Sequence, residues 1–236
     1  MSNKENYWKN FEDSFQNLKE NGFIKLPKID FVDFSSHFLH ISKEMKGKTF
    51  LENGISHNKF LDEIGFNKQV KEKLYNFAKQ EFKYEGEVSD EYHVARKVIP
   101  GNSKEMFRAH FDSHLFTFVF PISIPNKDFH NDAGQLIFFP HLRKQPQSEF
   151  SNLISKIWYK QYASKNGLEK LKKNNKYFIE YFEDMRPLLF LGNTFFHTNY
   201  PVSKSHETTR LTLLAHFYDP SPEFGVGSFL RALRNR

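Results

Sequence analysis

The chain has 236 residues, 39% hydrophobic and 17% aromatic, so it can bury one large core and does not have the composition of a disordered protein. It contains no cysteine, which excludes disulfides, thiolate metal sites and cysteine nucleophiles and leaves His, Asp and Glu as possible metal ligands. A net charge of +6 would suit an anionic ligand, but no zinc finger or basic base-reading helix is present, so no nucleic-acid partner is expected.

The first third of the chain, residues 1–89, is predicted to be mainly helical and to support the rest. Apolar residues recur at helical spacing over 7–21, 31–45 and 60–82, and Gly22 stands where the first of these helices would end. A short strand is expected in GFIKLPKI, directly after Gly22.

From about residue 90 the pattern changes to short aromatic segments that end at Gly or Pro, which is typical of strands. These segments are EYHVARKVIPG, SHLFTFVFPISIP, GQLIFFP, RPLLFLGNTFFH and RLTLLAHFYDP. They predict a β core over 90–218 with helices packed outside it. Helical periodicity over 141–186 predicts an insertion that covers the mouth of this core and sets specificity. One domain is expected, with 219–236 as a C-terminal tail.

The N-terminus, MSNKENYWKNFEDSF, is polar and acidic where a secretory signal needs an apolar core, and no run of 18 apolar residues occurs. We therefore expect a soluble, cytoplasmic protein without a membrane span. Basic residues cluster only at 168–176 and 231–236, and we interpret both clusters as solvated faces.

Two histidines and an acid stand together in FRAHFDSHLF, before an apolar run. If this stretch is a strand, His110 and Asp112 project from the same face and can reach one point, which would supply two ligands of a metal site. The best candidate for the third ligand is His197, which closes the strand LLFLGNTFFH.

An arginine and a hydroxyl share one face of the last predicted strand. Arg210 and Thr212 alternate with Leu211 and Leu213, so the guanidinium would point into the core. A buried arginine is costly unless an anion meets it, and its planar fork matches a carboxylate.

In this order and spacing, the residues resemble the iron(II)- and 2-oxoglutarate-dependent dioxygenases. HFD at 110–112, His197 and RLT at 210–212 match the pattern His-x-Asp, distal His and Arg-x-Ser/Thr of that family. DAGQLIFFP and HVARKVIPG look like two further strands of its core, and the resemblance covers roughly 90–218. It implies a double-stranded β-helix, or jelly roll.

The resemblance also implies a function. His110, Asp112 and His197 would hold iron(II), and 2-oxoglutarate would chelate the iron and pair its far carboxylate with Arg210, assisted by Thr212. With O2, the expected products are succinate, carbon dioxide and a hydroxylated small-molecule substrate. Halogenases of this family replace the acid with a small residue, so Asp112 favours hydroxylation.

Weaker candidates have ordinary structural explanations as well. His114 could contact the metal site or the substrate, His206 competes with His197 as a ligand, and His216 shares the face of Arg210 but is expected to be a core histidine. Four further residues could contact a substrate or the cosubstrate: Arg96, Arg108, Gln135 and Thr194.

Two other classes of protein remain open. A cupin-type metal protein, either a binding module or an isomerase, could use the same β core without oxygenase activity. A zinc hydrolase could use two His and one Asp, although the sequence offers no obvious general base beside them. The oligomeric state and the substrate cannot be inferred from the sequence.

Overall fold

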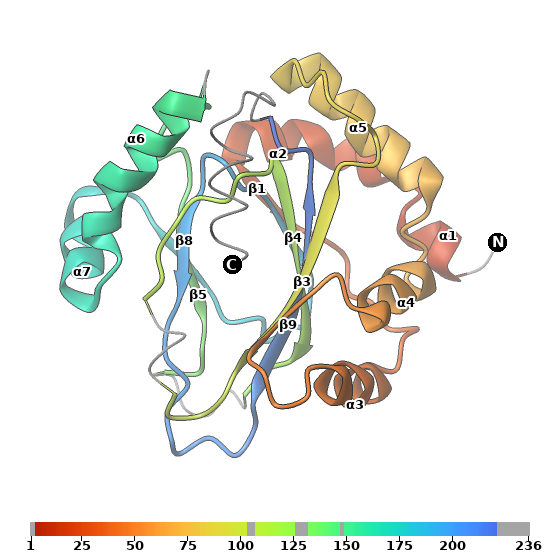
Figure 1. The fold of residues 1–236 in the computed structure, drawn as a ribbon. Coiled ribbons are helices and arrows are strands. Elements are labelled where there is room, and N and C mark those ends of the chain that lie inside the picture. The colour runs from red at the N-terminus through yellow and green to blue at the C-terminus, as the bar shows by residue number, and fades with distance from the viewer. Residues whose placement is uncertain (1–2, 103–106, 126–131, 147–148, 221–236) are drawn as a thin grey trace.

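The computed structural model describes residues 3–102, 107–125, 132–146 and 149–220, and shows a mixed fold of helices and antiparallel sheets (Figure 1). The strands are β1 (Phe23–Lys25), β2 (Phe50–Glu52), β3 (Glu91–Val98), β4 (Phe116–Ser123), β5 (Leu136–Phe139), β6 (Phe178–Glu180), β7 (Leu188–Leu191), β8 (Phe196–Asn199) and β9 (Arg210–Phe217). The larger sheet has the order β1-β7-β4-β9-β3-β2, and the smaller sheet has the order β6-β5-β8.

Helices cover the outer sides of both sheets (Figure 1). They are α1 (Asn3–Tyr7), η1 (Phe11–Ser14), α2 (Phe15–Asn21), α3 (Phe34–Glu44), α4 (Ile55–Glu63), α5 (Lys68–Phe82), α6 (Glu149–Tyr159), η3 (Lys160–Tyr162) and α7 (Lys165–Asn174). The elements up to α5 pack on the larger sheet, whereas α6 and α7 lie outside the smaller one (Figure 1).

The predicted helices form, but two of them are broken. The helix expected over 7–21 is split into short pieces and ends at Gly22, whose positive φ of 77° is the left-handed cap that was predicted. The helix expected over 60–82 is interrupted at Gly65, and Asn67 then starts α5 by accepting a hydrogen bond from the Val70 amide. The side chain of Asp33 caps α3 in the same way.

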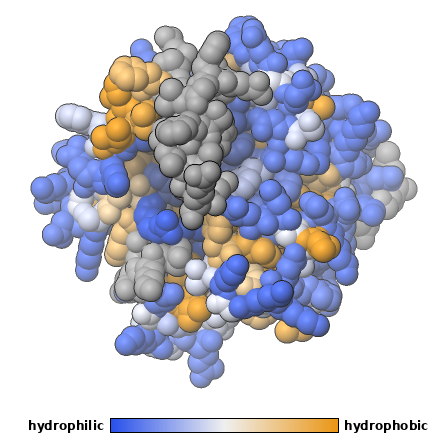
Figure 2. Space-filling model, in the orientation of Figure 1, coloured by the Kyte–Doolittle hydropathy of each residue, from blue (hydrophilic) through white to orange (hydrophobic). Residues whose placement is uncertain are grey.

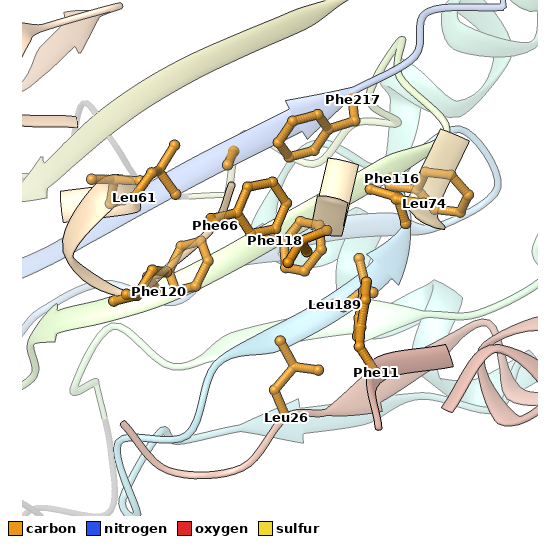
Figure 3. Close-up of a cluster of buried hydrophobic side chains, with 14 of the residues drawn as sticks. Phe11, Leu26, Leu61, Phe66, Leu74, Phe116, Phe118, Phe120, Leu189 and Phe217 are labelled. Carbon is orange, nitrogen blue, oxygen red and sulfur yellow. The ribbon is translucent and has the colours of Figure 1, made fainter. Parts of the chain in front are cut away.

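Alternation along β4 and β9 separates an apolar outer face of the larger sheet from an inner face that also carries polar residues. Phe116, Phe118 and Phe120 point outward and pack with Phe217 against the N-terminal helices (Figure 3). Fully burying each such side chain stabilises the fold by about 1.5–3 kcal/mol, so these aromatic rings dominate the energetics of the helix-covered side.

The inner face of the larger sheet packs against the smaller sheet. Val119 and Phe190 of the larger sheet belong to one buried cluster with Leu136 and Phe138 of the smaller. Phe139, Phe195 and Phe196, on or next to the strands of the smaller sheet, are buried as well.

Two predicted elements have different boundaries. The segment RPLLFLGNTFFH was expected to be one strand, but it forms β7 and β8 in different sheets, because the turn at 192–195 redirects the chain. The insertion at 141–186 is helical in its first part only, since its end forms β6 and pairs with β5. The predicted tail at 219–236, including the basic cluster at 231–236, lies outside the described residues from 221 onward.

Among the helices described, none combines the length and the apolar character that crossing a bilayer requires.

Candidate metal centre

The side chains of His110 and Asp112 meet the side chain of His197, which is distant in the sequence, on the inner side of the two sheets. The candidate ligand atoms of His110, Asp112 and His197 all lie within 4.8 Å of one another. Asp112 Oδ1 is 3.3 Å from Nε2 of His110 and 3.9 Å from Nε2 of His197. The three donors therefore face a common point.

The backbone of 107–115 holds this arrangement by crossing from the smaller sheet to the larger one. His110 exchanges two backbone hydrogen bonds with His197 of β8, at 3.0 and 3.1 Å. The amide of Asp112 donates to the carbonyl of Gly192 at 3.0 Å, and that of Leu115 donates to the carbonyl of Tyr218 at 2.8 Å. The expectation of a regular strand through His110 and Asp112 is therefore wrong, because β4 begins only at Phe116.

Both histidines present the nitrogen that a metal needs. Nδ1 of His110 lies 2.7 Å from the carbonyl of Arg108, and Nδ1 of His197 lies 3.1 Å from the carbonyl of Phe195. A carbonyl can only accept, so each Nδ1 carries a hydrogen, and Nε2 is the nitrogen that each ring turns toward Asp112. Burial lowers the pKa of His197 to about 4 despite the opposing charge of Asp112, which keeps this ring neutral.

The carboxylate of Asp112 is fixed through its second oxygen. The hydroxyl of Thr117 donates to Oδ2 at 2.6 Å, and Nε2 of His216 lies 3.8 Å from the same oxygen. Burial alone would raise the pKa of Asp112, but the interactions with His197, His110 and His216 hold it well below its usual value. The carboxylate of Asp112 is therefore ionised, and its Oδ1 faces the imidazoles of His110 and His197.

This donor set fits a divalent first-row metal. Two neutral imidazoles and one carboxylate on a single side of an ion form the facial triad of non-haem iron(II) sites, which leaves other coordination positions open. The side chain of His110 is 42% exposed, so the site is reachable from solvent, whereas Asp112 and His197 are buried. The arrangement is consistent with binding of iron(II).

A buried cation lies on the same inner face of the larger sheet. Arg210, only 2% exposed, donates to the hydroxyl of Thr212 at 3.4 Å, while its Nε has no hydrogen-bond partner. Among the described residues no carboxylate lies within ion-pair distance of it. Burial, followed by the charge of Arg96, lowers its pKa to about 9. A buried guanidinium with an unused hydrogen-bond donor can bind an anion such as a carboxylate.

Room for Arg210 is made by a glycine. Gly134 has a φ of +75°, and a Cβ at this position would lie 2.6 Å from Cδ of Arg210 and 2.8 Å from Cγ2 of Val202. Any other side chain would be strained by the backbone conformation and would also displace the arginine. The ring of Phe182 lies 5.9 Å from the guanidinium carbon and covers another side.

Three of the weaker histidine candidates have clear positions. His114 stacks on Tyr92 and lies beside His216, with ring centroids 6.0 and 5.3 Å apart, and it is not in the ligand group. Nδ1 of His216 is 3.0 Å from the carbonyl of Tyr92. His206 is buried, and it also does not belong to the ligand group.

The remaining candidates differ in their access to the site. Arg96 pairs in register with Thr212 and therefore shares the inner face, whereas Arg108 is exposed. The side-chain oxygen of Gln135 accepts from the amide of Ala133 at 3.0 Å, and the hydroxyl of Thr194 lies 3.4 Å from the carbonyl of Leu191. Both of these polar groups are therefore already engaged.

Sequence reasoning missed Thr117 and Gly134. Thr117 is the one hydroxyl in the apolar run LFTFVF, and a lone polar residue in a buried strand needs a partner. Gly134 lies two residues before β5, and a glycine next to a strand often marks a close approach of another group. The sequence could thus have indicated that both positions have a special role, but it does not identify Asp112 as the partner of Thr117 or Arg210 as the neighbour of Gly134.

Comparison with solved structures shows which proteins have a similar fold. A prolyl 4-hydroxylase from Phytophthora capsici matches 99% of this chain and 74% of its own, with a TM-score of 0.55 at 10% identity. A protein named IDO from Bacillus thuringiensis matches 88% of this chain and 95% of its own, with a TM-score of 0.51 at 13% identity. A prolyl-4-hydroxylase from Pseudomonas putida has a TM-score of 0.49 at 12% identity, covering 88% and 97% of the two chains.

No model of a known protein family matches the chain, and no curated protein matches it. At these identities the two matches with TM-scores of 0.55 and 0.51 establish a shared fold, and nothing further about this chain follows from them.

Proposed function

We propose that the chain is a non-haem iron(II)- and 2-oxoglutarate-dependent dioxygenase that hydroxylates a C–H bond of a small metabolite. The observation that carries the proposal is the pairing of two features on one inner face, a His-Asp-His group and a buried cation without an acidic partner among the described residues. A zinc hydrolase or a cupin-type binding module would have no use for that cation. The core would then be a double-stranded β-helix formed by the two facing sheets.

The proposed roles follow from the contacts of each residue. His110, Asp112 and His197 would hold iron(II) through Nε2, Oδ1 and Nε2, because the other polar atom of each side chain is already occupied. Arg210 and Thr212 would bind the far carboxylate of 2-oxoglutarate, which would provide the anion that the buried guanidinium lacks.

Bound iron(II), with 2-oxoglutarate and O2, supplies oxidative decarboxylation to succinate and carbon dioxide, coupled to oxidation of the substrate. The protein contributes binding, orientation and exclusion of water. Thr117 holds the carboxylate in one orientation, and the apolar cluster of the inner face, including Phe190 beside His197, shields the His197 side of the site from water. Tyr92 and Arg96 share this inner face and would contact the substrate.

The test measures succinate from the purified protein with iron(II), ascorbate and 2-oxoglutarate. Slow formation of succinate without added substrate is expected. His110→Ala and Asp112→Ala should abolish it while leaving the circular dichroism spectrum and melting temperature close to wild type. His40→Ala is a matched control, because His40 is an exposed histidine on α3, and it should leave the rate unchanged.

Absence of succinate from well-folded, iron-loaded wild-type protein would contradict the proposal and favour a binding module, an isomerase or a hydrolase. Full turnover by Asp112→Ala would show that the ligand assignment is wrong.

A further inference from the structure

Helix α6 is packed with its apolar face outward. Its apolar residues recur at three- and four-residue intervals, which places them on one side of the helix. They are Phe150, Leu153, Ile154, Ile157 and Trp158. Four of these are exposed by more than half: Phe150 by 72%, Ile154 by 51%, Ile157 by 64% and Trp158 by 66%. Figure 2 shows the patch they form over α6 at the upper left of the molecule.

The opposite face of α6 is polar and is fixed to the body of the protein. Arg143 donates to Oδ1 of Asn152 at 3.0 Å and also to the hydroxyl of Ser155. Lys156 donates to the hydroxyl of Ser113 at 3.0 Å. These bonds determine which side of the helix faces inward, so α6 cannot turn its apolar side to the core without breaking them.

Tyr159, on the same inner face, completes the attachment. Its hydroxyl donates to the carbonyl of Leu142 at 2.9 Å, and its ring lies 5.1 Å from that of Phe111. The guanidinium of Arg143 lies over the ring of Phe111, 3.9 Å from its centroid. The outward position of the apolar face is therefore built into the packing, and contiguous exposed apolar surface of this kind marks a site of interaction.

The charge next to this face indicates the kind of partner. Between residues 150 and 176 the sequence contains seven lysines and a single acidic residue, Glu169. The exposed ones are Lys160, Lys165, Lys170, Lys173 and Lys176. Helices α6 and α7 lie on the same side of the molecule (Figure 1), so the apolar face and the lysines can meet one surface together. That surface should be apolar and negatively charged.

We propose that the outward face of α6, together with the lysines of 160–176, binds the surface of a lipid bilayer that carries anionic headgroups. The helix would lie in the plane of the interface, with Trp158 and Phe150 between the headgroups and the lysines above them. A second copy of the chain fits less well, because it would bring two lysine-rich surfaces together. The segment 221–236 also fits less well, since it has three arginines and one glutamate.

The test uses the full chain with vesicles of phosphatidylcholine alone or with 30% phosphatidylglycerol. The chain has two tryptophans, and Trp8 is buried, so changes in accessible fluorescence report on Trp158. Anionic vesicles should sediment the protein, shift its emission to shorter wavelength and reduce quenching by acrylamide. Trp158→Phe should lose most of the shift and keep most of the binding.

Two sets of variants separate the apolar and the electrostatic contributions. Ile154→Ser with Ile157→Ser should abolish sedimentation, whereas Ile55→Ser should not, because Ile55 is a still more exposed isoleucine that lies on α4 and not on this face. Replacing Lys165, Lys170 and Lys173 together by Gln should weaken binding to anionic vesicles by about 100-fold, at about fivefold for each lysine.

Three results would overturn the proposal. One is failure of the wild-type protein to sediment with anionic vesicles. Another is a dimer in sedimentation velocity that Ile154→Ser with Ile157→Ser dissociates, since the face would then bind a second copy. The third is a Trp158 already as shielded from acrylamide as Trp8 in the free monomer, since another segment of the chain would then cover it. None of these measurements depends on the metal centre.

Discussion

Replacing Arg210 by methionine should stabilise the protein and remove its response to 2-oxoglutarate at the same time. Arg210 is almost fully buried and its Nε has no partner. Burial lowers its pKa from 12.5 to about 9. At about 1.4 kcal/mol for each pKa unit, keeping the charge there costs on the order of 5 kcal/mol. Since hydrogen bonds and packing of the stem offset part of this cost, Arg210→Met should raise the free energy of unfolding by about 1–4 kcal/mol.

The assay is urea unfolding of the metal-loaded protein with and without 2-oxoglutarate. Wild type should gain about 2.7 kcal/mol when the ligand is present at 100 times its Kd, whereas Arg210→Met should gain nothing. Arg143→Met is the matched control and should destabilise the protein, because Arg143 is a partly buried arginine whose Nε and terminal nitrogens all have hydrogen-bond acceptors. An Arg210→Met protein that is less stable than wild type, or that still gains stability from 2-oxoglutarate, would refute the reasoning.

Three further predictions concern positions around the site and in the core. Thr117→Val should weaken metal binding about 10–100-fold in calorimetry, because Oδ2 of Asp112 loses its hydrogen-bond donor. Thr117→Ser keeps the hydroxyl and should retain the affinity. If Thr117→Val bound the metal as tightly as wild type, Thr117 would not position the carboxylate. Gly134→Ala should displace Arg210 and thereby raise the 2-oxoglutarate concentration needed for half-maximal turnover about tenfold or more. An unchanged concentration would show that Arg210 does not bind this ligand. Burial, followed by His93, lowers the pKa of His57 to about 4, and the unfolded chain takes up this proton near pH 6.5. Stability should therefore fall by up to about 3 kcal/mol between pH 6.5 and pH 4, and His57→Leu should flatten the curve of unfolding free energy against pH; parallel curves would assign the loss to other groups.

The sequence predicted which residues meet at the site better than it predicted how they are held. His110 and Asp112 were expected to converge because alternate residues of a strand share a face. They do converge, but one is bonded to the smaller sheet and the other to the turn at Gly192. Such a crossing depends on pairing between segments about 80 residues apart, and local periodicity contains no information about it.

Helix α6 shows a second limit of the same kind. Its periodicity predicts a helix with one apolar face, and the helix is present. Periodicity gives the relative positions of side chains around a helix, but it does not tell which side faces the core. In α6 that choice is made by two bonds between the helix and the rest of the protein: Arg143, which lies outside the helix, donates to Asn152, and Lys156 donates to Ser113. The alternation of β9, by comparison, places Arg210 and Thr212 on the inner face as expected, because its other face is uniformly apolar.

The candidate site uses residues of both sheets, which links it to the spacing between those sheets. His197 belongs to the smaller sheet, whereas Thr117 and Arg210 belong to the larger, and the side chains of Phe138 and Phe190 act as spacers between them. A substitution that changes the volume of Phe138 or Phe190 would alter the distance between the imidazole of His197 and the guanidinium of Arg210, although neither of these residues is changed. The affinity for the ligand should therefore depend on the packing of the core between the two sheets.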